Sequence, residues 1–140
     1  MDRFRSLASA AFVLAATVAA LPASATAAPA EPQTRVIADC VHRKVEPRTV
    51  VPFCADGNVW AVIKRYGSWG HQVAWGSGRL HMNDCDPSCS AGTVHSYQAT
   101  FRLYRVVETR SGPMFTRLGV TYVKGGEQKN VHYSLPKNPL

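Results

Sequence analysis

The chain has 140 residues, of which 46% are hydrophobic, and its 16 Lys and Arg against 9 Asp and Glu give a formal net charge of +7. The basic residues form no block longer than two, and several, among them Arg102, Arg105, Arg110 and Arg117, are spread singly. This distribution argues against a dedicated nucleic-acid surface. The excess of positive charge instead fits loose attraction to polyanions such as wall polymers or acidic lipid heads.

The first 27 residues are predicted to be a helical signal peptide of the Sec type. Arg3 and Arg5 supply its positive start, and an uncharged apolar run of 15 residues follows from Leu7 to Leu21. Small residues then offer an A-x-A cleavage pattern that ends at Ala25 or Ala27. The run is shorter than the roughly 20 residues that cross a bilayer, so we expect no membrane span in the mature chain. Removal of 27 of the 140 residues leaves 113, enough for one domain.

The mature chain opens with a predicted flexible leader over residues 28–35, which is rich in Ala, Pro and Glu. The first expected strand, Arg48–Phe53, contains Pro52, which cannot donate to a strand ladder and so favours a sheet edge. Asp56-Gly57 is a strong turn signal. A second strand over Asn58–Tyr66 would complete a hairpin.

Glycines interrupt the next stretch of the chain. We expect one strand near Gln72–Trp75 and another near Gly78–Asn83. Gly76 and Gly78 mark bends, bulges or places where another backbone comes close. The following segment, residues 84–92, is rich in loop residues and is predicted to be pinned by its cysteines.

The longest alternating segment runs from Tyr97 to Leu103, with apolar side chains on one face and polar ones on the other. Such alternation predicts a half-buried strand, and the change of phase after it predicts a bulge near Tyr104 or Arg105. Ser111-Gly112-Pro113 is a predicted turn. Met114–Val123 would then return as the antiparallel partner.

The chain turns again at residues 124–127, and residues 131–134 are expected to add a short edge strand. Residues 136–140 are predicted to be a disordered tail. The mature chain shows no helical period with a cap. The predicted fold is therefore all-β: a single domain over residues 36–135, built as a small antiparallel β-sandwich or partly open barrel.

Four cysteines, Cys40, Cys54, Cys85 and Cys89, belong to the mature chain. An even number of cysteines in a small exported domain predicts two structural disulfides. A chain reversal at Pro47 would set Cys40 opposite Cys54, so we favour Cys40 with Cys54 and Cys85 with Cys89. The crossed pairings close longer loops and remain open.

One set of residues carries a family resemblance. Its members are Cys54-Ala55-Asp56-Gly57-Asn58, Trp69-Gly70, Ala74, Gly76, Gly78, Asn83-Asp84-Cys85, Asp86-Pro87-Ser88-Cys89, Ala91-Gly92 and His95-Ser96-Tyr97. This pattern resembles a family of small secreted proteins and lipoproteins from actinobacteria, with the motifs C-A-D-G-N, W-x-x-W-G, A-x-G-x-G and N-x-C-x-P-x-C-A-x-G. Tyr66 stands where the family has the first Trp of W-x-x-W-G. The resemblance implies an exported location and this architecture, and it assigns no chemistry.

The candidate binding surface consists of Trp60, Trp69 and Trp75 together with Tyr66. Aromatic faces bind sugar rings through apolar contact, and a wall-associated module would use them in that way. The alternative is that these large side chains form the core of a small domain.

Catalytic and metal sites receive little support from the sequence. A metal site would draw on the thiols with His71, His81 or His95, but no C-x-x-C pair exists and an oxidising compartment closes thiols first. Asp84 and Asp86 are ordinary turn residues. We therefore predict no metal, no cofactor and no catalytic residue.

The predicted function is that of a secreted, monomeric, non-catalytic module that binds an extracellular ligand, either a cell-wall polymer or a protein, and not nucleic acid. One alternative is a small hydrolase that uses His95 or His81 with Asp84 or Asp86. Another is a protease inhibitor that presents the loop between Cys85 and Cys89 rigidly to its target.

Overall fold

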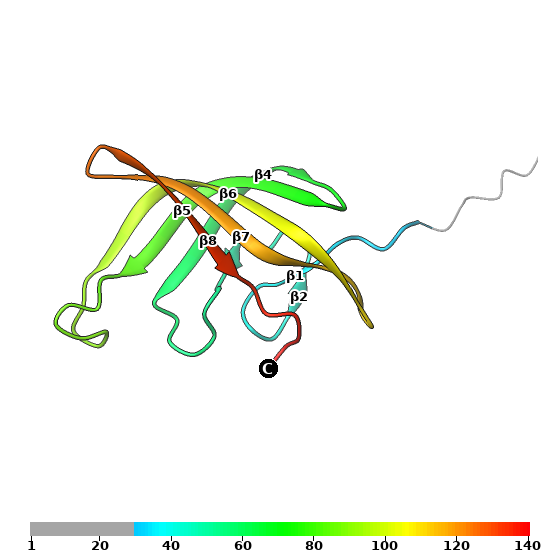
Figure 1. The fold of residues 1–140 in the computed structure, drawn as a ribbon, viewed down its shortest axis with the longest axis horizontal. Coiled ribbons are helices and arrows are strands. Elements are labelled where there is room, and N and C mark those ends of the chain that lie inside the picture. The colour runs from blue at the N-terminus through cyan, green and yellow to red at the C-terminus, as the bar shows by residue number, and fades with distance from the viewer. Residues whose placement is uncertain (1–29) are drawn as a thin grey trace, which may run out of the picture. The chain divides into compact units, whose positions relative to one another are not determined.

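The computed structural model describes residues 30–140, so the predicted signal peptide lies outside the described residues. Glu31–Leu140 form one compact unit. In this unit the chain folds into strands and contains no helix (Figure 1). The strands are β1 (Val36–Ile37), β2 (Arg43–Lys44), β3 (Thr49–Val50), β4 (Val59–Trp69), β5 (Val73–Asn83), β6 (Val94–Thr109), β7 (Gly112–Lys124) and β8 (Glu127–Ser134).

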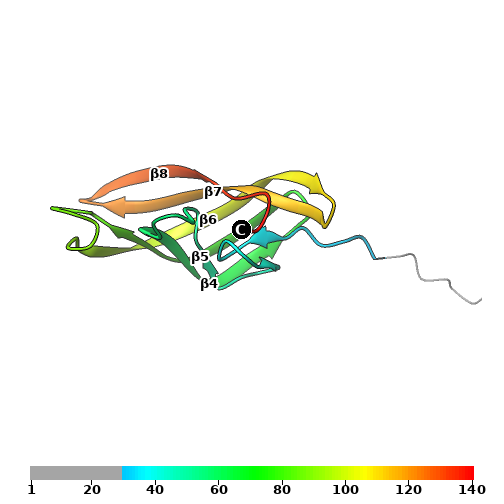
Figure 2. The same cartoon turned by 90° about the horizontal axis from the view of Figure 1, so that it is seen from below.

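Six of the strands form one antiparallel sheet in the order β3-β4-β5-β6-β7-β8, so each strand pairs with its neighbour in sequence. β1 and β2 pair separately as a small two-stranded sheet. The large sheet is curled into a half-barrel, with β4 and β8 on opposite sides of the β1 segment and the C-terminus (Figure 2). The predicted all-β fold with a partly open barrel is confirmed.

The inner face of the curled sheet carries the core. Phe101 and Leu103 of β6 are each 1% exposed, as the alternation of that segment predicts. β1 fills the space beneath them, and its Val36 and Ile37 are fully buried. A parallel bridge between Arg35 and Met114 joins the start of this segment to β7. The domain therefore closes its half-barrel with its own first strand.

The predicted hairpin between β3 and β4 is present. Thr49 pairs with Val62, and Val50 pairs with Ala61. β3 is the edge strand, which agrees with the presence of Pro52 two residues after its end. Gly57 adopts a φ of +61° in the connecting turn, as Asp-Gly predicts.

β5 is one strand of 11 residues, so the prediction of two strands separated at its glycines is wrong. The glycines are needed because β4 lies unusually close to β5. A Cβ at Gly78 would stand 2.0 Å from the Val62 carbonyl oxygen, and one at Gly76 would stand 2.7 Å from Ile63 Cγ2. The register of β4 shifts between Ile63 and Arg65, which places an irregularity beside these glycines. The expectation of a close approach is thus confirmed, although the strand continues through it.

The β6–β7 and β7–β8 pairs follow the predicted meander. Arg105 has a φ of +60°, so β6 is distorted where a bulge was predicted. The register of β6 against β7 is the same on both sides of Arg105, so the strand is kinked there without an inserted residue. β8 starts at Glu127, four residues earlier than the predicted edge strand, because its polar side chains pair against β7 just as well.

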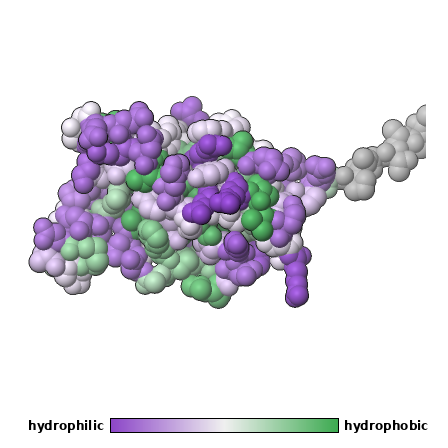
Figure 3. Space-filling view, in the orientation of Figure 1, coloured by the Kyte–Doolittle hydropathy of each residue, from purple (hydrophilic) through white to green (hydrophobic). Residues whose placement is uncertain are grey.

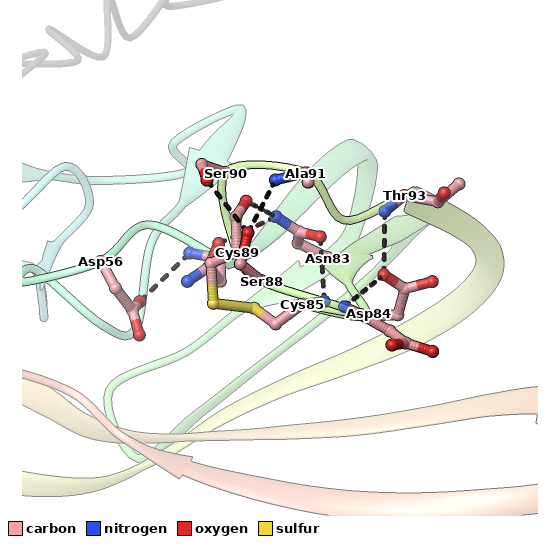
Figure 4. The surroundings of a disulfide bond; sticks show 11 residues. Asp56, Asn83, Asp84, Cys85, Ser88, Cys89, Ser90, Ala91 and Thr93 are labelled. Atoms are coloured by element: carbon pink, nitrogen blue, oxygen red, sulfur yellow. Dashed lines mark hydrogen bonds between the residues drawn. A yellow bond between two sulfur atoms is a disulfide. The ribbon is translucent and has the colours of Figure 1, made fainter.

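Both disulfides have the favoured pairing, Cys40 with Cys54 and Cys85 with Cys89, and the described chain has no free cysteine. The second bond closes the loop after β5 (Figure 4). Disulfides persist in oxidising compartments. The pairing therefore indicates an oxidising, extracellular type of environment.

The ends of the unit make specific contacts. Thr34, which the sequence assigns to the leader, is 1% exposed. Its hydroxyl donates to the His71 carbonyl at 2.7 Å. In the segment after β8, the Leu140 amide donates to the Cys40 carbonyl at 2.9 Å. Over residues 30–140, we find no helix with the length and apolar character that crossing a membrane requires.

Candidate functional site

The four aromatic residues of the predicted binding surface are divided between the two faces of the sheet. Trp69 belongs to the core side, where its indole Nε1 donates to the Thr34 carbonyl at 2.9 Å and its ring meets Phe115 edge-on at 5.4 Å. Tyr66 packs edge-on against Trp69 at 5.0 Å. These two residues hold the fold together and are not available to a ligand.

Tyr66 is fixed by its hydroxyl, which donates to the Pro47 carbonyl at 2.8 Å. Burial of the phenol and, secondarily, the nearby carboxylate of Glu46 raise the pKa of Tyr66 well above its ordinary value. A neutral phenol that donates to a backbone carbonyl is a structural group.

The other two tryptophans lie on the outer face of the sheet. Trp60 is half-buried and stacks on His81, with ring centroids 5.0 Å apart. Trp75 is 48% exposed and is the most exposed of the three. Trp75 pairs with Arg102 while His81 pairs with Ser96, so the two tryptophans belong to different, separated rows across the sheet.

Trp75 begins a row of four side-chain positions that crosses four strands. It pairs with Arg102 of β6, Arg102 pairs with Gly119 of β7, and Gly119 pairs with His132 of β8. Residues paired in register project from the same face of a sheet. We call this set, together with Tyr104, the Trp75 row.

Arg102 is held between two aromatic rings. Its guanidinium carbon lies 5.4 Å from the centre of the Trp75 ring and 4.8 Å from that of Tyr104. The Tyr104 hydroxyl is in turn 3.1 Å from His132 Nδ1. Among the described residues Arg102 has no ion pair. Cation–π contacts use the flat face of the guanidinium, so its N–H edge stays free to donate.

A hollow with a volume of about 150 Å³ lies beside Gly119 in the Trp75 row. Four residues of the row line it: Trp75, Arg102, Gly119 and His132. The rest of its lining comes from Thr100, Val120, Thr121 and Asn130. The rings of His132 and Tyr104 lie against Gly119, since a Cβ there would be 3.2 Å from His132 Nδ1 and 3.6 Å from Tyr104 Cε1.

A wider, shallow depression of about 510 Å³ continues from this hollow along the same sheet. The two share Thr100 and Thr121. The depression adds basic and amide side chains, among them Lys64, Arg65, Gln98 and Gln128. The combined surface therefore offers cations, hydroxyl groups and amides next to one exposed indole.

Carboxylates are absent from this outer face in the described residues. Of the acidic residues, only Glu108 and Glu127 lie within the five long strands. Glu108 shares the strand face of Val106, and Glu127 shares the strand face of Val131. Both valines pack against the core, so the two glutamates belong to the inner side. The arginines on the outer face are consequently not neutralised by facing acids.

The face shown in Figure 3 carries mainly hydrophilic residues, with apolar patches interspersed. Exposed large apolar side chains come from separate elements: Val41, Phe53, Trp75, Val94, Val123 and Leu140. No broad apolar docking surface is visible on the face shown.

The structure joins one of the predicted His–Asp pairs. His95 Nε2 lies 2.9 Å from an Asp84 carboxylate oxygen. Asp84 also accepts the backbone amides of Thr93 at 2.8 Å and Asp86 at 3.2 Å (Figure 4). The hydrogen bond from His95, followed by these backbone amides, lowers the pKa of Asp84 to about 2.

The hydrogen bonds of this pair fix the loop between β5 and β6. The nearby Ser88 and Ser90 hydroxyls bind each other at 3.0 Å, and no hydrogen bond joins either of them to His95 within residues 30–140. His81 stacks on Trp60 instead of meeting a carboxylate. Asn83 completes the clamp by donating to the Cys89 carbonyl at 2.7 Å.

His71 lies 3.7 Å from Glu31 and takes part in neither the His95–Asp84 pair nor the His81–Trp60 stack. Within the described part of the chain, no three His, Cys, Asp or Glu side chains come together as a metal site would require. Comparison of the chain with protein-family models, with curated proteins and with solved structures found no match. The resemblance to exported actinobacterial proteins stays an expectation.

Sequence reasoning identified Trp75 but not its partners Arg102, Tyr104, Gly119 and His132. Arg102 and Gly119 each lie in a segment of alternating polar and apolar residues. That alternation indicates which face of the sheet each residue occupies but not which residues of the adjacent strands lie beside it. Only the register of three successive strand pairs brings them into one row. Counting back from the Ser111-Gly112-Pro113 turn would have paired Arg102 with Gly119.

Proposed function

We propose that the mature domain is an exported, non-catalytic binding module whose outer sheet face holds an anionic polysaccharide of the cell wall. The observation that carries this proposal is Arg102, an unneutralised guanidinium flanked by Trp75 and Tyr104 on a face without carboxylates.

Charge supports an anionic ligand. A sheet face that gathers Arg65, Arg79 and Arg102 attracts negative polymers and concentrates them at the surface. Arginine matches carboxylate and phosphate groups with two parallel hydrogen bonds. Both groups occur on wall polymers.

The remaining side chains support a saccharide over other polyanions. Sugars combine many hydroxyl groups with apolar C–H faces, so they suit sites that mix amides and hydroxyls with an aromatic ring. Thr100, Thr121 and Asn130 supply the polar groups here, and Trp75 supplies the ring. Nucleic acid would call for several stacking rings along a track, whereas this hollow offers the single exposed indole.

The predicted leader and the disulfides together support a location outside the plasma membrane. The predicted signal peptide would export the chain, and two disulfides suit the oxidising space beyond the membrane. A wall polymer is the abundant anionic saccharide in that place.

Sedimentation with isolated cell walls tests the proposal. The mature domain is mixed with walls that keep or lack their anionic polymers, at salt from about 50 mM to about 200 mM. We expect binding to intact walls that weakens steeply with salt, and little binding to stripped walls. Equal binding to both wall preparations would contradict an anionic ligand, and stronger binding to duplex DNA than to walls would contradict a saccharide.

A matched pair of variants separates the face from the net charge. The face variant carries Arg65→Gln, Arg79→Gln and Arg102→Gln. The control variant loses the same charge at exposed positions off this face, through Arg110→Gln, Lys124→Gln and Lys137→Gln. The face variant should no longer sediment with the walls, whereas the control variant should still bind them. Equal losses in both would show that net charge alone drives binding.

A further inference from the structure

We infer that the hollow at Gly119 is a subsite for one sugar residue that carries a carboxylate or phosphate group. The inference rests on the proposed function and deepens it. The sugar ring would lie against Trp75, its anionic group would meet the N–H edge of Arg102, and its hydroxyl groups would meet Thr121 and Asn130.

The size of the hollow limits the ligand to a single small ring. Its volume of about 150 Å³ is below the roughly 300–1,000 Å³ of pockets that hold drug-sized molecules. The neighbouring depression is open and shallow, so further residues of a polymer continue there without enclosure. One sugar ring therefore makes close contacts in the hollow, and the rest of the polymer binds weakly along the open depression.

Gly119 lines the hollow beside His132. Its φ is not in the left-handed region, so the backbone does not require glycine. A Cβ at this position would meet the rings of His132 and Tyr104, which lie against it. A larger side chain would therefore displace the His132 ring that lines the hollow.

The flanking rings give the site its selectivity for an anion attached to a ring. The Trp75 and Tyr104 rings hold the Arg102 guanidinium, so its donors are positioned before the ligand arrives. The Tyr104 hydroxyl is itself placed by His132 at 3.1 Å. A neutral sugar would leave the guanidinium without an acceptor, and a free anion would leave the indole uncovered.

Titration with small probes, followed by Trp75 fluorescence or by the indole Nε1 resonance, tests the subsite. The probes are glucuronic acid, glucose 6-phosphate, glucose and inorganic phosphate. We expect one or both anionic sugars to bind about tenfold or more tightly than glucose or inorganic phosphate, since glucose lacks the charge-assisted hydrogen bonds to Arg102 and inorganic phosphate lacks the ring that would cover Trp75. The comparison between the two anionic sugars identifies carboxylate or phosphate as the preferred group.

Two variants make the test specific. Gly119→Val should weaken anionic-sugar binding about tenfold or more, with unfolding temperature measured alongside to confirm the fold. Arg102→Lys keeps the charge but loses the planar fork, so it should lose the preference for anionic over neutral sugar while salt-sensitive wall binding remains. Unchanged probe binding in Gly119→Val would overturn the subsite and leave the proposed function standing. Wild-type protein that binds neither walls nor probes would overturn both.

Discussion

Trp75 and Arg102 face each other across the β5–β6 ladder, with the guanidinium carbon 5.4 Å from the centre of the indole ring. This pair marks the outer face of the sheet as the side that meets a ligand. The opposite face is occupied by the core and by β1. The contrast between the two faces leads to the first prediction.

Substitutions of two tryptophans should have opposite consequences. Trp69→Ala removes a hydrogen bond to Thr34 and the packing on Phe115, so it should cost about 3 kcal/mol of unfolding free energy. Trp75→Ala is a surface change and should alter stability by about 0.5 kcal/mol or less, yet it should abolish wall binding. Urea unfolding and sedimentation measure the two effects. A destabilised Trp75→Ala with wild-type binding would contradict the division of roles.

A pair of glycine substitutions tests the close approach of β4 and β5. Gly78→Ala would press its Cβ to 2.0 Å from the Val62 carbonyl oxygen, so the backbones must separate and about 3 kcal/mol should be lost. Gly67→Ala meets no atom within 4 Å and should be neutral or stabilising by about 0.5 kcal/mol. Thermal unfolding of both variants checks the difference. Similar unfolding temperatures would argue against this packing of the two strands.

The two disulfides should contribute unequally. Their sequence separations are 14 and 4 residues. Chain-entropy reasoning assigns about 3 kcal/mol to the longer loop and about 2 kcal/mol to the shorter one. Replacing both Cys40 and Cys54 by Ala should therefore destabilise the domain more than replacing Cys85 and Cys89. Denaturant unfolding of the two double variants gives the comparison, and the reverse order would refute the loop argument.

The loop between β5 and β6 should loosen at low pH. The pKa of Asp84 is lowered from its ordinary 3.8 to about 2 in the folded chain. The carboxylate therefore stabilises the loop fully above about pH 4, and this contribution disappears as pH falls through about 2. The protection of the Thr93 amide from hydrogen exchange, measured relative to the intrinsic rate at each pH, should fall over that interval.

Two single substitutions check the origin of this effect. Asp84→Asn should leave the Thr93 amide poorly protected at every pH, because the carboxylate that accepts from both the Thr93 amide and His95 is gone. Asp86→Asn keeps Asp84 and its partners and should behave like the wild type. Identical exchange in all three proteins would show that Asp84 does not clamp the loop.

The strand order could be predicted from the sequence because the turns are explicit. Asp56-Gly57 and Ser111-Gly112-Pro113 each join two segments of alternating character, and every long strand pairs with its neighbour in the chain. The alternation from Tyr97 to Leu103 also gave the buried face correctly. Local signals suffice for a meander, since none of its large-sheet pairings skips a strand.

Predictions failed where the role of a residue depends on a contact with another part of the sequence. Gly76 and Gly78 suggested a break in the chain, but they accommodate the backbone and Ile63 side chain of β4. Tyr66 and Trp69 were grouped with Trp75, although both pack against the core. The irregular register of β4 turns Tyr66 inward, and Trp69 lies on the face of the buried Ala61 and Ile63. The partners of Trp75 depend on three cumulative registers, which no single segment specifies.

The most direct test follows the three tryptophan indole Nε1 resonances while an anionic wall polysaccharide is added. Trp75 stands on the proposed binding face, whereas the Trp69 indole is engaged with Thr34 on the core side and serves as an internal control. The account predicts that the Trp75 resonance and the Arg102 side-chain resonance move together while that of Trp69 stays. Shifts confined to the Cys85–Cys89 loop, or none at Trp75, would contradict the claim that the outer sheet face is the binding site.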